Sequence, residues 1–165
     1  MQKLAIALSF ALMSSLTSAQ APKITRIDVT DVGVYDLNVV SAGAPNENGI
    51  RLGVANNEQF VESTRTIHLR MGVHFGFRYS IVGVPDGAPV QLRTVAIYPP
   101  QGLHNPDVPN PIFRNERILA TKIGVANSYR GVTLDHDWGL VPGDWTLEIW
   151  YGDQKLASET FTLIP

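Results

Sequence analysis

The sequence predicts an all-β protein, a two-sheet antiparallel sandwich of about seven to nine strands, with a small closed β-barrel as the alternative. Eleven prolines and fourteen glycines are spread along the chain and interrupt every long helical pattern. Several segments alternate between apolar and polar residues, which is the period of a half-buried strand. Turn-forming residues separate these segments and no helical segment lies between them, which favours stacked antiparallel sheets.

The first residues do not belong to this domain. Residues 1–19 have the layout of a secretory signal peptide: Lys3, then an apolar run, then small residues ending at Ala19. We expect cleavage after Ala19, and cleavage after Ala21 is the second choice. A membrane anchor is the alternative, but spanning a bilayer needs about 20 apolar residues and this run is shorter. The expected product is one domain, residues 20–165, located in the periplasm or secreted.

Composition excludes several functions. Without Lys3, the mature chain carries 12 basic and 15 acidic residues, and no basic block is present to attract nucleic acid. No later segment is apolar enough to span a membrane. The chain has no cysteine, which excludes thiol catalysis and thiolate metal sites.

The clearest strand signal covers residues 67–81, where every odd position is apolar and most even positions are polar. A single strand of this length would span about 50 Å, against a usual ~17–20 Å. We therefore expect the segment to bend or divide near Gly72 or Gly76, where a bulge is easily formed.

The C-terminal end predicts a β-hairpin. Residues 145–151 alternate, Gly152 and Asp153 form a plausible two-residue turn, and residues 156–163 return. Weaker strand signals cover residues 24–30, 32–39, 90–98, 118–125 and 132–136.

Two segments are predicted to be loops. Residues 41–57 are rich in Gly, Asn and Ala, and residues 99–116 contain five prolines. Long loops on a rigid sheet scaffold are frequent recognition elements, so residues 99–116 are a candidate binding segment.

Two stretches of the sequence resemble a known family. They are residues 75–85 with 90–99 and Gly102, and residues 140–152 with the closing 161–163. Together they resemble an uncharacterised family of exported bacterial proteins, catalogued as a domain of unknown function. The resemblance implies an immunoglobulin-like β-sandwich and a Gram-negative periplasmic setting, and it brings no catalytic residues.

No motif predicts catalysis, a metal or a cofactor. His68 and His74 lie about 20 Å apart in an extended strand, too far to share a metal ion. Asp135, His136 and Asp137 form the densest group of metal-ligand types, but neighbouring strand residues point to opposite faces. Three or four convergent ligands are needed, so a polar strand end is the simpler interpretation. The nucleophile elbow and the phosphate-binding loop are both absent from the sequence.

Aromatic side chains give the positive signal for binding. Trp150 falls on the strand face opposite to Trp145, and an exposed Trp on a sandwich often marks a binding surface. The alternative is that Trp150 packs against a Lys or Arg stem. Trp138, Tyr98 and His104 are the further candidate binding residues.

These observations favour a non-enzymatic periplasmic binding or accessory module that uses no cofactor. Its expected partner is an envelope protein or a glycan, and not nucleic acid. The first alternative is a carbohydrate-binding or hydrolytic envelope protein, with Trp138 and Trp150 stacking on sugar rings. The second is a passive envelope component without a small ligand.

Overall fold

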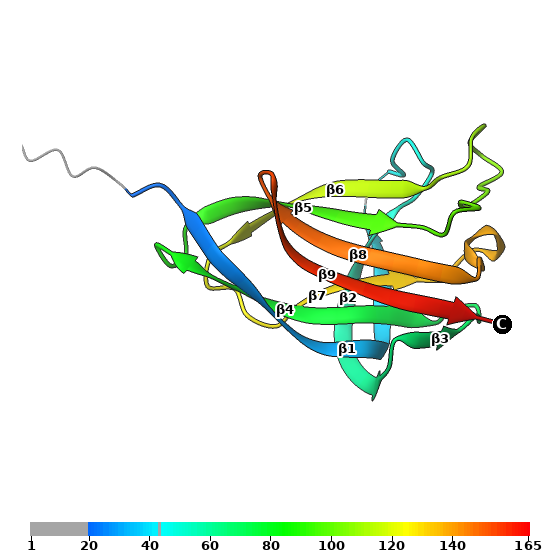
Figure 1. Cartoon of the computed structure of the whole chain (residues 1–165), viewed down its shortest axis with the longest axis horizontal. Coiled ribbons are helices and arrows are strands. Elements are labelled where there is room, and N and C mark those ends of the chain that lie inside the picture. Colours follow the sequence, from blue (N-terminus) through cyan, green and yellow to red (C-terminus); the bar gives the residue numbers. More distant parts are fainter. Residues whose placement is uncertain (1–19, 43) are drawn as a thin grey trace, which may run out of the picture.

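The chain folds into two stacked β-sheets (Figure 1). The structure is a computed structural model that describes residues 20–42 and 44–165. Within these residues, the first sheet has the strand order β2-β1-β4-β7 and the second has the order β3-β9-β8-β5-β6. The elements are β1 (Lys23–Ala42), β2 (Leu52–Ser63), β3 (Thr66–His68), β4 (His74–Val84), β5 (Pro89–Ile97), β6 (Arg114–Lys122), β7 (Ser128–Thr133), the 3₁₀ turn η1 (Asp137–Gly139), β8 (Gly143–Tyr151) and β9 (Gln154–Ile164). The predicted sandwich is therefore confirmed, and the two sheets remain separate instead of closing into a barrel.

The core lies between the sheets, where the alternating residues of the central strands meet. Phe75 and Phe77 of β4 and Phe161 of β9 are completely buried, and Trp145 of β8 is 2% exposed. The Phe75 ring centre lies 5.0 Å from that of Phe161 and 6.0 Å from that of Trp145. Each such side chain contributes about 1.5–3 kcal/mol by leaving water, so this aromatic cluster holds the sheets together.

The long alternating segment divides at Gly72, as predicted. Gly72 has a φ of 78°, and its N–H donates to the Leu134 carbonyl at 2.7 Å. Before this turn, β3 pairs in parallel with β9 in the second sheet, and after it β4 pairs with β1 and β7 in the first. One sequence pattern thus supplies strands to both sheets, and all other pairings of the named strands are antiparallel.

The first two predicted strands are one long, bent strand. The two weak signals at 24–30 and 32–39 both lie in β1, and Asp31 between them has a φ of 49° at a register shift. The pairing of β1 with β4 ends at Tyr35, and from Asp36 onward β1 pairs only with β2. The outer part of the β1–β2 hairpin therefore extends beyond β4 as a two-stranded ribbon.

The prediction of a loop over residues 41–57 is wrong at both of its ends, whereas residues 44–51 between them lie outside the strands. Strand β2 begins at Leu52 and runs to Ser63, and β1 continues to Ala42. The prediction failed because β2 is almost entirely exposed and therefore has no apolar alternation to detect.

Two other strands are displaced from their predicted positions. The signals at 118–125 and 132–136 correspond to Arg114–Lys122 and Ser128–Thr133, each starting four residues earlier. The structure consequently places two residues that were expected to lie outside strands, Arg117 and Arg130, within them.

The proline-rich segment is an ordered connection between β5 and β6. Leu103 and Ile112 form an isolated β-bridge, and both are buried. The Gly102 N–H donates to the Pro99 carbonyl at 2.8 Å, which closes a tight turn at the start of the segment. The last residues of the predicted loop, from Arg114 on, belong to β6.

The predicted C-terminal hairpin is confirmed. Strands β8 and β9 pair along their whole length around the two-residue turn, where Gly152 has a φ of 55°. This positive φ suits the turn type that matches the twist of paired strands.

The predicted signal peptide, residues 1–19, lies outside the described residues. Within the part of the chain that is described, no helix has the length and apolar character needed to cross a membrane.

Candidate functional site

The outer part of the β1–β2 hairpin crosses from the first sheet to the second. We call residues 36–42 and 44–58 the hairpin arm. In Figure 1 the cyan loop of the arm lies beside the end of β6. Asn46 Nδ2 donates to Asn115 Oδ1 at 2.6 Å, and Asn105 Nδ2 donates to the Asn48 carbonyl at 2.9 Å. These asparagine contacts fasten the arm to the second sheet.

A cavity of about 720 Å³ lies between the arm, β6 and β7. The arm contributes Leu37, Val39 and Ile50, β6 contributes its inward residues, and Trp138 and Trp145 also line the space. Small-molecule sites are concave, mostly apolar and about 300–1,000 Å³ in volume, so this cavity has the size and character of one.

Arg130 projects into this cavity from β7. It pairs across the ladder with Phe77, which is completely buried, and cross-strand partners share one face of a sheet. Its Nη1 donates to the Gly131 carbonyl at 3.1 Å. Its Nε is enclosed and has no hydrogen-bond partner among the described residues. Burial lowers the pKa of Arg130, and the neighbouring positive charge of Arg117 lowers it further, while the tyrosines nearby raise it.

Arg117 enters the cavity from the opposite side. It pairs with Thr94 of β5, which is 7% exposed and faces the space between the sheets. Its Nη2 donates to the Ile50 carbonyl of the arm at 2.7 Å, and burial lowers the pKa of Arg117. Within residues 20–42 and 44–165, neither Arg117 nor Arg130 forms an ion pair with a carboxylate.

Aromatic residues form one wall of the cavity. Tyr98 is 8% exposed, and its ring centre lies 4.8 Å from that of Trp145 in an edge-to-face contact. Burial raises the pKa of Tyr98 to about 12, and both Arg117 and Arg130 act to lower it. The Tyr98 phenol is therefore neutral at physiological pH and retains its O–H as a donor.

Carboxylates are few around the cavity. Glu58 of the arm and Asp135 lie on its lining. Asp135 Oδ1 lies 3.8 Å from His136 Nε2, and the His136 ring stacks on Trp138 at 5.0 Å. Among the described residues, no three His, Asp or Glu side chains are grouped closely enough to hold a metal ion.

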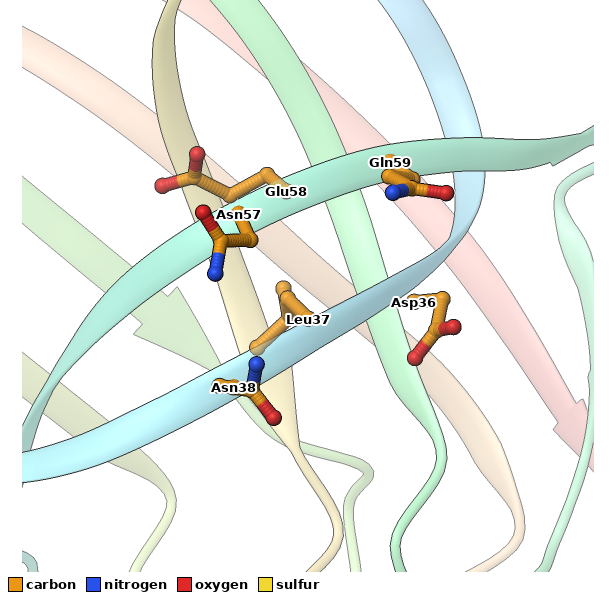
Figure 2. A pocket seen from close by; sticks show the side chains of 6 residues that line it. All are labelled: Asp36, Leu37, Asn38, Asn57, Glu58 and Gln59. Atoms are coloured by element: carbon orange, nitrogen blue, oxygen red, sulfur yellow. The ribbon is translucent and has the colours of Figure 1, made fainter.

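A second, shallower depression of about 540 Å³ lies on the arm itself (Figure 2). It forms where the β1–β2 ladder shifts register between Asp36 and Asn38. Figure 2 shows that its polar side chains, including Asn57 and Glu58, are spread along both strands and do not point to one centre. The inter-sheet cavity, whose lining includes both Arg117 and Arg130, is the better candidate site.

The structure brings together two of the four predicted binding residues. Tyr98 and Trp138 both line the cavity, whereas Trp150 and His104 do not. The exposed His104 ring contacts the Gln101 carbonyl at 3.2 Å, outside the cavity.

Trp150 lies on the outer face of the second sheet. Its Nε1 donates to Glu148 Oε2 at 2.8 Å, and the guanidinium carbon of Arg93 lies 4.8 Å from the ring centre. Lys155 also approaches the ring, at 5.7 Å. The structure thus places Trp150 against a neighbouring Arg and Lys, the residue types that its alternative interpretation named, with their charged groups over the ring.

Sequence reasoning missed the two strand arginines of the cavity, Arg117 and Arg130, which Arg51 of the arm joins on the lining. Arg117 and Arg130 each lie just before a predicted strand, and arginine in a half-buried strand is ordinarily assigned to the solvent face. The only available signal was that the side chain of Arg130 in a strand points to the opposite face from its neighbours Tyr129 and Gly131. This alternation does not identify which of the two faces is the inward one.

These features define an immunoglobulin-like sandwich with an internal, arginine-lined cavity. The chain belongs to the family described as a domain of unknown function (DUF3859), whose model matches residues 25–163. It is also similar to the crystal structure of an immunoglobulin-like protein from Pseudomonas aeruginosa. The two are 19% identical with a TM-score of 0.59, over 89% of this chain and 99% of that one. At this identity the likeness concerns the fold. No curated protein matches the sequence.

Proposed function

We propose that this protein is a non-enzymatic binding module of the bacterial envelope, and that its ligand site is the cavity between the hairpin arm, β6 and β7. The observation that carries the proposal is a cavity of about 720 Å³ that joins an aromatic wall to the enclosed Nε of Arg130, which has no hydrogen-bond partner within residues 20–42 and 44–165. A concave apolar space with a few convergent polar groups is the usual form of a small-molecule site.

A probe without charge tests this proposal. N-phenyl-1-naphthylamine fluoresces when it leaves water, and we expect the wild-type protein to bind it with a saturable increase in emission. Leu119 lines the cavity from the edge strand β6 and is 39% exposed. Leu119→Trp should narrow the space and weaken binding by about 5-fold or more, because overfilling a site excludes its ligand.

Ala120→Trp is the matched control for this experiment. Ala120 is the next residue of β6, is exposed, and does not line the cavity. Its substitution should leave the affinity for the probe unchanged. Equal affinity in all three proteins, or no saturable binding by the wild type, would contradict the cavity as the site.

The proposed periplasmic location has separate support, because residues 1–19 carry the layout of a signal peptide. We expect the protein, expressed with its own N-terminus in a Gram-negative host, to be recovered in the periplasmic fraction with Gln20 as its first residue. Recovery of the full-length chain in the cytoplasmic fraction would contradict this part of the proposal.

The carbohydrate-binding alternative depends on Trp138 and Trp150 sharing one surface. Only Trp138 lines the cavity, and the Trp150 ring is covered by Arg93 on the outer face of the second sheet. The geometry therefore favours a ligand held inside the sandwich.

A further inference from the structure

We infer that the cavity binds an organic anion with an apolar body, whose carboxylate, phosphate or sulfonate group lies between Arg130 and Arg117 while the rest contacts the aromatic wall. This inference rests on the proposed function and specifies its ligand class.

Within the described part of the chain, the charge of Arg130 is not compensated by a carboxylate. Its Nε is enclosed without a hydrogen-bond partner among the described residues, and its Nη1 reaches only the carbonyl of its own neighbour. The carboxylates of Glu58 and Asp135 lie on the cavity lining, but neither forms an ion pair with Arg130. A buried charge is costly unless it is paired. An anion that enters the cavity and pairs with Arg130 therefore stabilises the folded protein.

A further cation, Arg117, faces the same space. Arg117 is close enough to Arg130 to affect its ionisation, and like charges repel. One Arg117 nitrogen is committed to the Ile50 carbonyl, which orients the guanidinium group. Guanidinium groups recognise carboxylate and phosphate through paired N–H donors, and an anion between the two arginines relieves their repulsion.

A neutral donor lines the same space as the two arginines. Tyr98 lies on the cavity lining together with Arg117 and Arg130, and both of their charges act to lower the pKa of its buried phenol. A neutral phenol donates a hydrogen bond to an anion without adding charge. Arginine and phenol donors together specify an anionic group, and the Tyr98 ring continues into the contact with Trp145.

The size of the cavity decides against a simple inorganic ion. An ion such as sulfate would displace only a few waters, each of about 30 Å³, from a space of about 720 Å³. The remaining lining includes Leu37, Leu103, Trp138 and Trp145. Only a ligand with an apolar part would remove this surface from water.

Two probes that differ by one charged group test the inference. 8-Anilinonaphthalene-1-sulfonate is N-phenyl-1-naphthylamine with an added sulfonate, and the wild-type protein should bind it at least 10-fold more tightly. Arg130→Gln should weaken sulfonate binding by about 10-fold or more, because a charge-assisted hydrogen bond is lost. The same substitution should change binding of the neutral probe by less than about 3-fold.

Three controls accompany this experiment. Arg93→Gln removes an arginine on the outer face, where Arg93 contacts Glu116 and Trp150, and should leave both affinities unchanged. Arg117→Gln is a second cavity variant. If Arg130→Gln fails to fold, the loss of sulfonate affinity is measured on Arg117→Gln instead. Sodium sulfate at matched ionic strength should compete only weakly with the organic sulfonate.

Each outcome separates the two proposals. Equal affinity for both probes would overturn the anion inference and leave the cavity as a binding site. If neither probe bound to the wild-type protein, both the anion inference and the proposed function would be overturned. Full competition by sodium sulfate together with no binding of the neutral probe would overturn both the apolar-body part and the cavity as the site of an apolar ligand, and would indicate a site for an inorganic anion.

Discussion

The space between the two sheets has a packed half and a hollow half. In the packed half, Phe75, Phe161 and Trp145 from the central strands fill the gap and are at most 2% exposed. In the hollow half, the inward positions of the edge strands β6 and β7 carry Arg117 and Arg130, and a cavity of about 720 Å³ remains. The same two sheets bound both halves, so the difference comes from the residues at the inward positions.

This contrast assigns stability and binding to different strands. The central strands have neighbouring strands on both sides. Within the aromatic cluster, all of their inward residues are apolar. The edge strands break that pattern at Arg117 and Arg130. The hairpin arm forms a third wall there, so the space is covered without being filled by side chains. Departures from consistent patterning are expected at functional sites, because they cost stability that only a ligand compensates.

The largest effect should come from the packed half. Phe161 is completely buried and contacts Phe75, so Phe161→Ala should lower the free energy of unfolding by about 3–5 kcal/mol through lost burial and a new void. Urea denaturation monitored by tryptophan fluorescence measures this change. A loss under about 1 kcal/mol would mean that the two halves are equally loosely packed, which would remove the contrast.

Tyr98 lies at the border between the halves, because it contacts Trp145 and also lines the cavity. Burial raises its pKa to about 12, against about 10 in the unfolded chain. The unfolded phenol therefore ionises first, so stability from this group is complete below about pH 10 and is lost as the pH rises towards 12.

Comparison of wild type with Tyr98→Phe isolates this contribution. Between pH 8 and pH 11 the wild type should lose about 1.4 kcal/mol more unfolding free energy than the variant, measured by urea denaturation at each pH. An identical pH dependence would show that the phenol is hydrated through the cavity and belongs to the hollow half.

Substitution of Arg130 should not lower the free energy of unfolding, in contrast to substitution of Phe161. Arg130→Met removes an enclosed cation and keeps a long apolar stem, so the unliganded protein should gain about 1 kcal/mol of stability or remain unchanged. Thermal unfolding without added anions measures this shift. A loss of more than about 2 kcal/mol would identify Arg130 as part of the packed core and would remove the basis for an anion site.

The packed half could be predicted from the sequence, and the hollow half could not. Alternation over residues 67–81 and 145–151 identified the buried residues of β4 and β8, because an apolar inward face has a direct signature in one strand. Strand length and the two glycines predicted a bend or division near Gly72 or Gly76, and the structure places the division at Gly72. Tyr98 and Trp138 were found as single aromatic residues, without any indication that they share a cavity.

The hollow half depends on contacts between distant segments. The inward direction of Arg130 is set by its pairing with Phe77, 53 positions earlier in the chain, and that of Arg117 by its pairing with Thr94. Residues 41–57 were predicted as a loop because β2 has no buried face of its own. Its position depends on Asn46, which contacts a residue 69 positions away. Local patterns carry no information on such pairings.

The smallest expected effect concerns the fastening of the arm. Asn115 Oδ1 accepts from Asn46 Nδ2 at 2.6 Å and from Asn48 Nδ2 at 3.3 Å, and Asn115 is 8% exposed. Asn115→Ala should cost about 0.5–1.5 kcal/mol at this contact, while global stability changes by only a few tenths, because the arm can open without unfolding the sheets. Hydrogen exchange should therefore accelerate in the arm and remain unchanged in β4 and β8. The same variant should speed both entry and release of the neutral naphthylamine probe, since the arm forms one wall of its site. If exchange accelerated equally in β4, the arm would be part of the packed unit, and ligand entry would require a different route between β6 and β7.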